Sequence, residues 1–238
     1  MPPTLILIRH AEAEHNASEN YDIHDPPLTT DGLRQCRELS EHLQKKCPIA
    51  DKVEHIITSP MRRTLQTTLN GLDWLIERGV RVEVDAMWQE NYDGPCDTGS
   101  ALDTLAAEFP ALDFSKVDPV YPDKSPGTPY AYGRSANAAR GQACLRRLYA
   151  RPEQAIAVVA HSGFLRTAIS KRRYHYADYR IFTFRQDHQN GLLRLVEDGV
   201  TARRGGGLGR SPKGSYPVNE WDFPPERDED AEVEAAMR

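Results

Sequence analysis

The sequence is short of cysteine and of long apolar runs. Its 238 residues include four widely spaced cysteines, Cys36, Cys47, Cys96 and Cys144, with no C-x-x-C pair. This spacing predicts neither a zinc site nor a disulfide framework. The N-terminus lacks the basic segment and apolar core of a signal peptide, and its apolar run is too short to span a membrane. We therefore expect a protein of a reducing compartment, most simply cytoplasmic, with no membrane partner.

Positive charge is also limited. Lys and Arg total 30 against 35 Asp and Glu, so the formal net charge is -5 and the sequence pI is near 5.9. This balance gives no general attraction to nucleic acid, and we expect no nucleic-acid partner. Any anion site must therefore be a local group of Arg and His. The Gly-rich run at 205–209 does not match a phosphate loop, because no apolar strand precedes it and no Lys-Ser/Thr pair follows it.

Two apolar runs each end in a histidine. Residues 5–8 lead directly into Arg9-His10, and residues 155–160 lead into His161-Ser162. A continuous apolar run of this length is typical of a strand that is buried on both faces of a parallel sheet. Ligands of open α/β sheets bind beyond the carboxyl ends of such strands. The pattern therefore predicts that both histidines lie at the usual position for chemistry.

The rest of the chain alternates predicted strands and helices, with caps expected at Thr29 or Thr30, at Ser59 and at Ser100. Residues 110–129 are dense in Pro, Asp and Ser and predict a surface loop or lid. Further strands are predicted at 53–58, 80–84, 180–184 and 192–196, and a polar turn is predicted at 187–191. Helices are predicted from about 30 to before Pro48 and at 60–78, 100–109, 134–149 and 164–171.

The composition changes beyond residue 199, first to a Gly-rich segment and then to an acidic run at 226–234. We therefore predict one domain over residues 1–202, with a lid or insertion at about 90–135. Residues 203–238 are predicted to form a C-terminal tail that is partly flexible.

Four short motifs occur in a fixed order along the chain. They are Arg9-His10-Ala11-Glu12-x-x-x-Asn16, Leu28-Thr29-x-x-Gly32-x-x-Gln35, Ser59-Pro60-Met61-Arg62-Arg63-Thr64-Leu65-Gln66-Thr67 and Val158-Val159-Ala160-His161-Ser162-Gly163. Together they resemble the signature of the histidine phosphatase superfamily, which includes phosphoglycerate mutases and many phosphatases. Residues 89–100 and 177–180 resemble a fungal and plant branch of phosphoglycerate mutase-like proteins. The resemblance implies a three-layer α/β/α fold with a mostly parallel central sheet.

The same resemblance implies a role for each residue of a phosphate pocket. A phosphoryl group carries about two negative charges near neutral pH, and arginines can bind it bidentately. Nearby guanidinium charges lower the pKa of a histidine, which keeps it neutral and able to attack phosphorus. The implied set is His10 as nucleophile, Arg9 and Arg63 as phosphate ligands, His161 as a second donor, Glu90 as proton donor, and Asn16 with the backbone N–H of Ser162 completing the pocket. No metal or cofactor is expected.

Some of these assignments have rivals in the sequence. Arg62 stands beside Arg63, and Asp93 and Asp97 lie close to Glu90. Ala11 stands where the family usually has Gly, and its Cβ is expected to narrow the phosphate pocket slightly. His15, His24, His42, His55 and His188 are interpreted as solvated or structural.

The expected function is hydrolysis of a small phosphomonoester through a phosphohistidine on His10. A mutase is less favoured, because residues 91–115 contain no Arg or Lys to hold a second phosphate. A second alternative is a natural-product enzyme that uses the cationic pocket for non-phosphoryl chemistry on a carboxylated substrate. A non-catalytic phospholigand-binding module is the last alternative, since binding alone does not require an acid.

Overall fold

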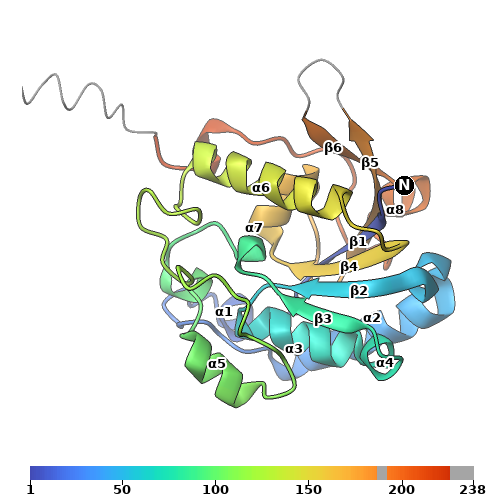
Figure 1. Ribbon diagram of the computed structural model, residues 1–238, viewed down its shortest axis with the longest axis horizontal. Helices are drawn as coiled ribbons and strands as arrows, with labels where there is room; N and C mark the ends of the chain where they lie inside the picture. The colour runs from blue at the N-terminus through green and yellow to red at the C-terminus, as the bar shows by residue number, and fades with distance from the viewer. Residues whose placement is uncertain (187–191, 226–238) are drawn as a thin grey trace, which may run out of the picture.

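A six-stranded sheet forms the centre of the molecule (Figure 1). The computed structural model describes residues 1–186 and 192–225. The strand order is β3-β2-β4-β1-β5-β6; the first four strands are parallel, β5 is antiparallel to β1, and β6 is antiparallel to β5. The strands are β1 (Thr4–Arg9), β2 (Val53–Thr58), β3 (Arg81–Val84), β4 (Ala155–Ala160), β5 (Tyr179–Gln186) and β6 (Leu193–Glu197). The prediction of a mostly parallel α/β sheet is confirmed.

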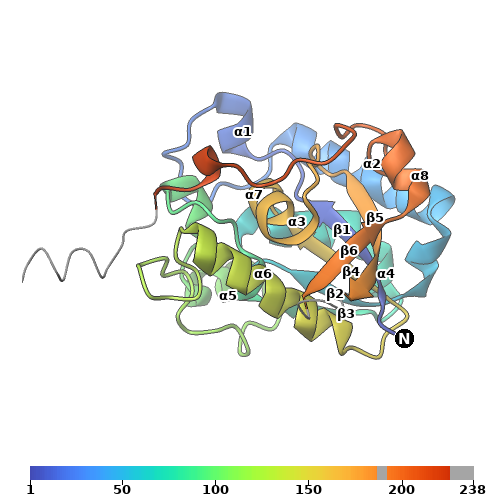
Figure 2. The same cartoon turned by 90° about the horizontal axis from the view of Figure 1, so that it is seen from above.

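Helices cover both faces of this sheet (Figures 1 and 2). Along β1 the side chains alternate, so that Leu5 and Leu7 pack in one core cluster while Ile6 and Ile8 pack in the other. The cluster with Ile6 and Ile8 includes side chains of α2 (Thr30–Lys46) and α4 (Asp73–Glu77). The cluster with Leu5 and Leu7 includes side chains of α6 (Arg134–Tyr149) and α7 (Ser162–Phe164). This arrangement explains why β1 and β4 are apolar throughout.

The helix starts agree only partly with the predicted caps. Thr29 caps α2, because its Oγ1 accepts a hydrogen bond from the Gly32 amide at 2.9 Å. The cap predicted at Ser59 is wrong: α3 (Arg62–Gly71) begins later, with Met61 at the N-cap, because the Ser59 amide still pairs with Val159 at the end of β2.

Ser100 is likewise not a cap. The N-cap of α5 (Leu102–Glu108) is Ala101, and the Ser100 hydroxyl accepts a hydrogen bond from Arg62. The remaining helices are α1 (Glu14–Ser18), α8 (Gly199–Arg204), a π-helix (Leu165–Ser170) that continues α7, and four 3-10 helices (Pro48–Lys52, Ala86–Trp88, Pro95–Asp97 and Glu220–Asp222).

The predicted insertion at about 90–135 packs closely on the domain. Phe114, Val117 and Tyr130 are buried in a third core cluster together with Leu65 of α3 and Val84 of β3. The Pro-rich segment at 110–129 is therefore a packed cover whose aromatic and aliphatic side chains anchor it beside the pocket.

The described part of the C-terminal segment also belongs to the fold, where its composition had favoured a partly flexible tail. Asp178 accepts hydrogen bonds from the amides of Leu208, Arg210 and Ser211. Gly206 has a φ of +85°, and a Cβ there would lie 2.2 Å from the Asp178 carboxylate, so glycine serves close packing at this turn. The predicted turn at 187–191 and the acidic run at 226–234 lie outside the described residues.

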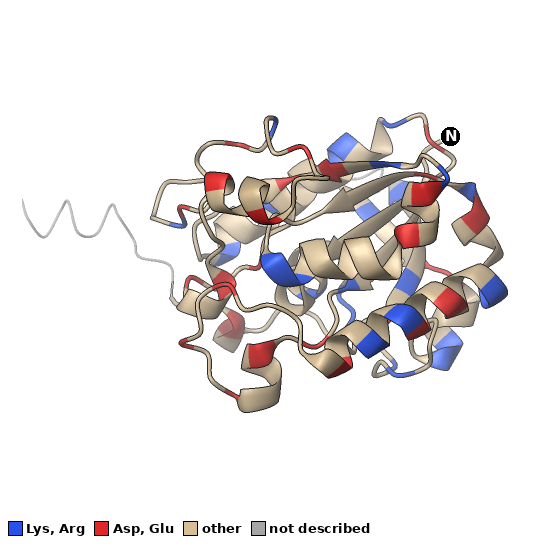
Figure 3. Ribbon diagram, turned by 90° about the horizontal axis from the view of Figure 1, so that it is seen from below, with Lys and Arg blue, Asp and Glu red and all other residues tan. Residues whose placement is uncertain are grey.

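Positions of Lys and Arg and positions of Asp and Glu are interspersed along the ribbon in Figure 3. Within the described residues, no helix is long and apolar enough to cross a membrane.

Candidate active site

His10 lies just past the end of β1 and is held by backbone contacts on two sides. Its amide donates to the Ala160 carbonyl at 3.0 Å, and its carbonyl accepts from the Ala177 amide at 3.2 Å. The imidazole is 3% exposed, and its Nδ1 lies 2.7 Å from the Ala11 carbonyl oxygen. Because a carbonyl can only accept, Nδ1 must carry the ring proton. The other nitrogen, Nε2, is then left with a free lone pair.

The surroundings of His10 keep the ring neutral. Burial lowers its pKa well below the ordinary value of 6.5, and the charges of Arg63 and Arg9 lower it further. A neutral imidazole that carries its lone pair on Nε2 is the form that can act as a nucleophile.

Arg63 extends from the first turn of α3 into the pocket, where it is 1% exposed. Its Nε donates to Nε2 of His10 at 3.3 Å, its Nη1 to the Cys96 carbonyl at 2.7 Å, and its Nη2 to Oδ1 of Asp97 at 2.7 Å. Arg62 points elsewhere and binds Glu108 of α5. Of these two adjacent arginines, the structure brings only Arg63 into contact with His10.

Arg9 is the last residue of β1 and directly precedes His10. Its Nη1 donates to the Tyr174 carbonyl at 2.9 Å, and its guanidinium carbon lies 4.0 Å above the centre of the Tyr176 ring. The Tyr176 ring is 6.5 Å from that of His10. The cation–π contact and the carbonyl contact fix the direction in which the guanidinium faces.

His161 follows β4, the strand beside β1, and its ring centre is 5.3 Å from that of His10. It is fully buried, and its Nε2 lies 2.9 Å from the Ser59 hydroxyl. Its pKa lies well below 6.5, mainly because the ring is buried and, to a smaller extent, because of the positive charge of Arg63. The register that pairs Arg9 with Ala160 is what brings the two histidines side by side.

Glu90 approaches from the loop after β3 and reaches the helix that follows His161. Its Oε2 accepts from the Gly163 amide at 2.8 Å, and its Oε1 accepts from the amides of Phe164 and Asn91 at 2.7 and 2.9 Å. These amides hold the carboxyl group in one orientation. Ser162 begins this helix, and its backbone N–H is the group that was predicted to bind phosphate. The next two amides, of Gly163 and Phe164, donate to the Glu90 carboxylate.

The second carboxylate of the pocket, Asp97, contacts Arg63, and burial raises its pKa to about 6. Lys124 forms hydrogen bonds with the backbone of the loop that carries Glu90 and Asp97. Its ammonium donates to the carbonyls of Glu90, Tyr92 and Asp97 at 2.7, 2.5 and 2.6 Å.

Asn16 and Ala11 differ from their predicted roles. The amide oxygen of Asn16 accepts from the Ala13 amide, and its nitrogen lies 2.9 Å from Nε2 of His15, so both polar groups have local partners. Ala11 is fully buried in the core cluster on the α2 side. Its methyl group therefore packs in the core, which accounts for the tolerance of Ala where the family usually has Gly.

The sequence did not single out Ser59 or Lys124 as pocket residues, and it placed His15 among the solvated or structural histidines. His15 is 5% exposed, with its ring 6.4 Å from that of His10. In the folded chain His15 lies close to Cys96 and Asp97, and one donor atom from each of the three lies within 4.8 Å of the others. The only feature of the sequence that could have placed His15 in the site is its position five residues after His10, and a surface histidine could equally occur there.

The fold and this pocket define an α/β protein with a pair of neutral histidines and two arginines at the carboxyl ends of parallel strands. The model of the histidine phosphatase superfamily, branch 1, matches residues 5–197. The chain belongs to this superfamily.

Two relatives are informative. A Schizosaccharomyces pombe protein named "Probable phosphatase" is 34% identical over 170 residues, which cover 68% of this chain and 76% of the relative. A phosphoglycerate mutase-like protein of Arabidopsis thaliana is 30% identical over 204 residues, covering 70% and 73% of the two chains. The protein is thus a phosphatase- or mutase-like enzyme by family.

Among solved structures, the α-ribazole phosphatase from Shigella flexneri aligns with a TM-score of 0.52 and 20% identity, covering 82% of this chain and 96% of that one. A mycobacterial hydrolase aligns with a TM-score of 0.50 and 17% identity, covering 82% and 97%. At these identities the likeness establishes the fold alone.

Proposed function

We propose that the protein is a phosphatase that hydrolyses a small phosphomonoester through a phosphohistidine at Nε2 of His10. The observation that carries this proposal is the hydrogen-bonding state of His10. Its Nδ1–H donates a hydrogen bond to the Ala11 carbonyl, so the lone pair is on Nε2, which lies 3.3 Å from Nε of Arg63. A buried neutral imidazole among guanidinium groups is suited to attack on a bound dianion.

In the first step, Nε2 of His10 attacks phosphorus and the bond from phosphorus to the leaving oxygen breaks. Arg9 and Arg63 bind the phosphoryl oxygens and offset the charge that spreads over them. His161 is proposed as a further donor to these oxygens. Glu90 gives a proton to the leaving oxygen, so that an alcohol departs.

In the second step, water attacks the phosphohistidine and the phosphorus–nitrogen bond breaks. The Glu90 carboxylate accepts a proton from the water, inorganic phosphate leaves, and the His10 lone pair is restored. Asp97 has a different proposed role: in the free enzyme it neutralises Arg63, and the substrate phosphate replaces or joins it there.

Two observations support a phosphatase over a mutase. The relative in Schizosaccharomyces pombe is named a phosphatase. In addition, the cation of the insertion that lies nearest to the acids, Lys124, is 8% exposed and donates to three carbonyls. It is therefore not available to hold the second phosphate of a bisphosphorylated intermediate.

The test is phosphate release from p-nitrophenyl phosphate and from a panel of small phosphomonoesters, from acid to neutral pH. We expect hydrolysis by the wild type and a loss on the order of 10⁴-fold or more in His10→Ala. Wild-type protein that releases no phosphate from any ester would refute the phosphatase. Conversion of a carboxylated substrate without phosphate release would favour the non-phosphoryl alternative.

A further inference from the structure

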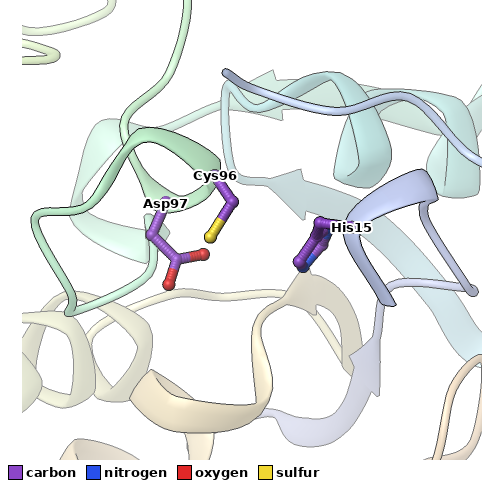
Figure 4. Close-up of side chains that lie close together, drawn as sticks. All are labelled: His15, Cys96 and Asp97. Carbon is purple, nitrogen blue, oxygen red and sulfur yellow. The ribbon is translucent and has the colours of Figure 1, made fainter. Parts of the chain in front are cut away.

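Three side chains that are common metal ligands meet at the edge of the pocket. One nitrogen of His15, the Cys96 sulfur and a carboxylate oxygen of Asp97 all lie within 4.8 Å of one another. Figure 4 shows His15 pointing from α1 towards Cys96 and Asp97, which lie in the 3-10 helix Pro95–Asp97. Two segments about eighty positions apart in the chain thus supply one compact group of donors.

Two residues of this group are buried, Asp97 is partly exposed, and one polar atom of the group lacks a partner. His15 is 5% exposed and Cys96 is 1% exposed. Within the described residues, Nδ1 of His15 is buried and has no hydrogen-bond partner. Buried polar groups almost always have partners, so this imidazole nitrogen is available to a ligand.

Two of the three donors are also hydrogen-bonded to neighbouring residues, as the ligands of metal sites usually are. Metal-bound imidazoles and carboxylates are normally hydrogen-bonded through their other atoms, which fixes their orientation. Here the Asn16 amide contacts Nε2 of His15 at 2.9 Å, and Arg63 donates to Oδ1 of Asp97 at 2.7 Å. His15 and Asp97 therefore each have a supporting partner outside the group of three donors.

We propose that His15, Cys96 and Asp97 form a binding site for one borderline-soft divalent cation of the Zn²⁺ class. A nitrogen, a sulfur and a carboxylate oxygen are the donor types that Zn²⁺ takes, and three protein ligands leave a fourth position for water. Oxygen-preferring ions such as Mg²⁺ and Ca²⁺ do not match this donor set.

The charges at the site balance when the ion binds. On binding, the sulfur–hydrogen bond of Cys96 gives way to a metal–sulfur bond and the proton goes to solvent. The thiolate and the Asp97 carboxylate then supply two negative charges to the ion, and the Asp97 carboxylate is shared between the ion and Arg63.

The site can be tested on the full chain after metal has been removed with a chelator. Titration with Zn²⁺ against a chromophoric chelator is expected to show one ion per chain. Replacing Zn²⁺ with Co²⁺ is expected to give the charge-transfer absorption of a cobalt–thiolate bond. In Cys96→Ser this absorption is expected to vanish, and Zn²⁺ affinity is expected to fall at least about 100-fold.

Two further variants make the result specific. His15→Gln is expected to lose Zn²⁺ affinity to a similar extent, which tests the site if Cys96→Ser does not fold. Cys47→Ser removes another buried thiol, from the far end of α2, and is expected to keep both the affinity and the cobalt absorption. Wild type that binds no stoichiometric Zn²⁺, absorption that persists in Cys96→Ser, or loss of binding in Cys47→Ser would overturn the proposal.

Discussion

The two sides of the pocket are built in different ways. His10 and His161 follow neighbouring parallel strands, and the hydrogen-bond register of β1 with β4 sets the distance between them. Glu90 and Asp97 instead lie on a loop that belongs to no sheet. The position of this loop depends on side chains, above all on the three hydrogen bonds from Lys124.

This contrast separates the proposed nucleophile, His10, from the proposed proton donor, Glu90. The strand side is held by the backbone of the whole domain, so a substitution there should remove chemistry and leave the geometry intact. The loop side is held by a few buried polar contacts, so it should be sensitive both to its acids and to their anchor. The following predictions test that difference, in decreasing order of expected effect.

The largest effect is expected from the acid on the loop side. Glu90→Gln should lower kcat about 10²–10⁴-fold for substrates with a poor leaving group, because proton transfer is lost while the amide contacts largely persist. Asp97→Asn is the matched control, since it neutralises the other carboxylate of the same loop, and it should cost less than about tenfold. Steady-state kinetics on an alkyl phosphate measures both. A larger loss in Asp97→Asn would make Asp97 the proton donor.

The next effect is expected from the arginine that joins the two sides. Arg63→Lys should lower kcat/KM about 10²–10³-fold, because an ammonium cannot reproduce the planar fork that contacts His10, Cys96 and Asp97 together. Arg62→Lys is the control on the next residue and should change kcat/KM less than about threefold. Equal losses in the two variants would contradict the assignment of Arg63.

A smaller effect is expected from the anchor of the loop. Lys124→Met should lower kcat about tenfold, because the carbonyls of Glu90 and Asp97 lose their shared donor and the acids are no longer held in place. Lys116→Met removes an exposed lysine from the same insertion and should leave kcat unchanged. The comparison is made at saturating substrate. Full activity in Lys124→Met would show that the loop is held in another way.

The smallest effect concerns the strand side and is a dependence of stability on pH. The pKa of His161 is depressed in the folded protein, so below about pH 6.5 the unfolded chain takes up a proton that the native chain does not. Stability should therefore fall as pH decreases from about 6.5. His161→Gln should reduce that slope by about 1.4 kcal/mol per pH unit, as measured by urea unfolding at a series of pH values.

His24→Gln is the control for this slope, because His24 is exposed. It should leave the pH dependence of unfolding as it is in the wild type. An unchanged slope in His161→Gln would mean that the buried histidine binds a proton in the native state.

The sequence was most informative where the backbone does the positioning. The apolar runs before His10 and His161 predict buried strands, and the structure has them as β1 and β4. Strand neighbours cannot be read from such runs alone, but parallel strands bring their carboxyl ends to one edge of the sheet. This is why Arg9, His10 and His161 could be predicted to meet.

The loop side was less predictable, because its contacts join residues distant in the chain. Nothing in the sequence around Lys124 shows that its ammonium reaches carbonyls at 90–97. Ser59 has the sequence of a helix cap, yet its hydroxyl contacts His161, because backbone pairing with β4 extends one residue past the end of β2. The glycines at 205–207 have the composition of a flexible tail, yet they allow close packing around Asp178. Local patterns do not contain such tertiary contacts.

The most direct test of the account is the chemical state of His10 during turnover. Wild-type protein is mixed with a rapidly hydrolysed phosphomonoester, quenched in alkaline denaturant and digested, and its peptides are analysed by mass spectrometry. We predict an acid-labile phosphate on the peptide that contains His10, and no such label in His10→Ala. Turnover without any phosphorylated peptide, or a label on a residue other than His10, would contradict the account.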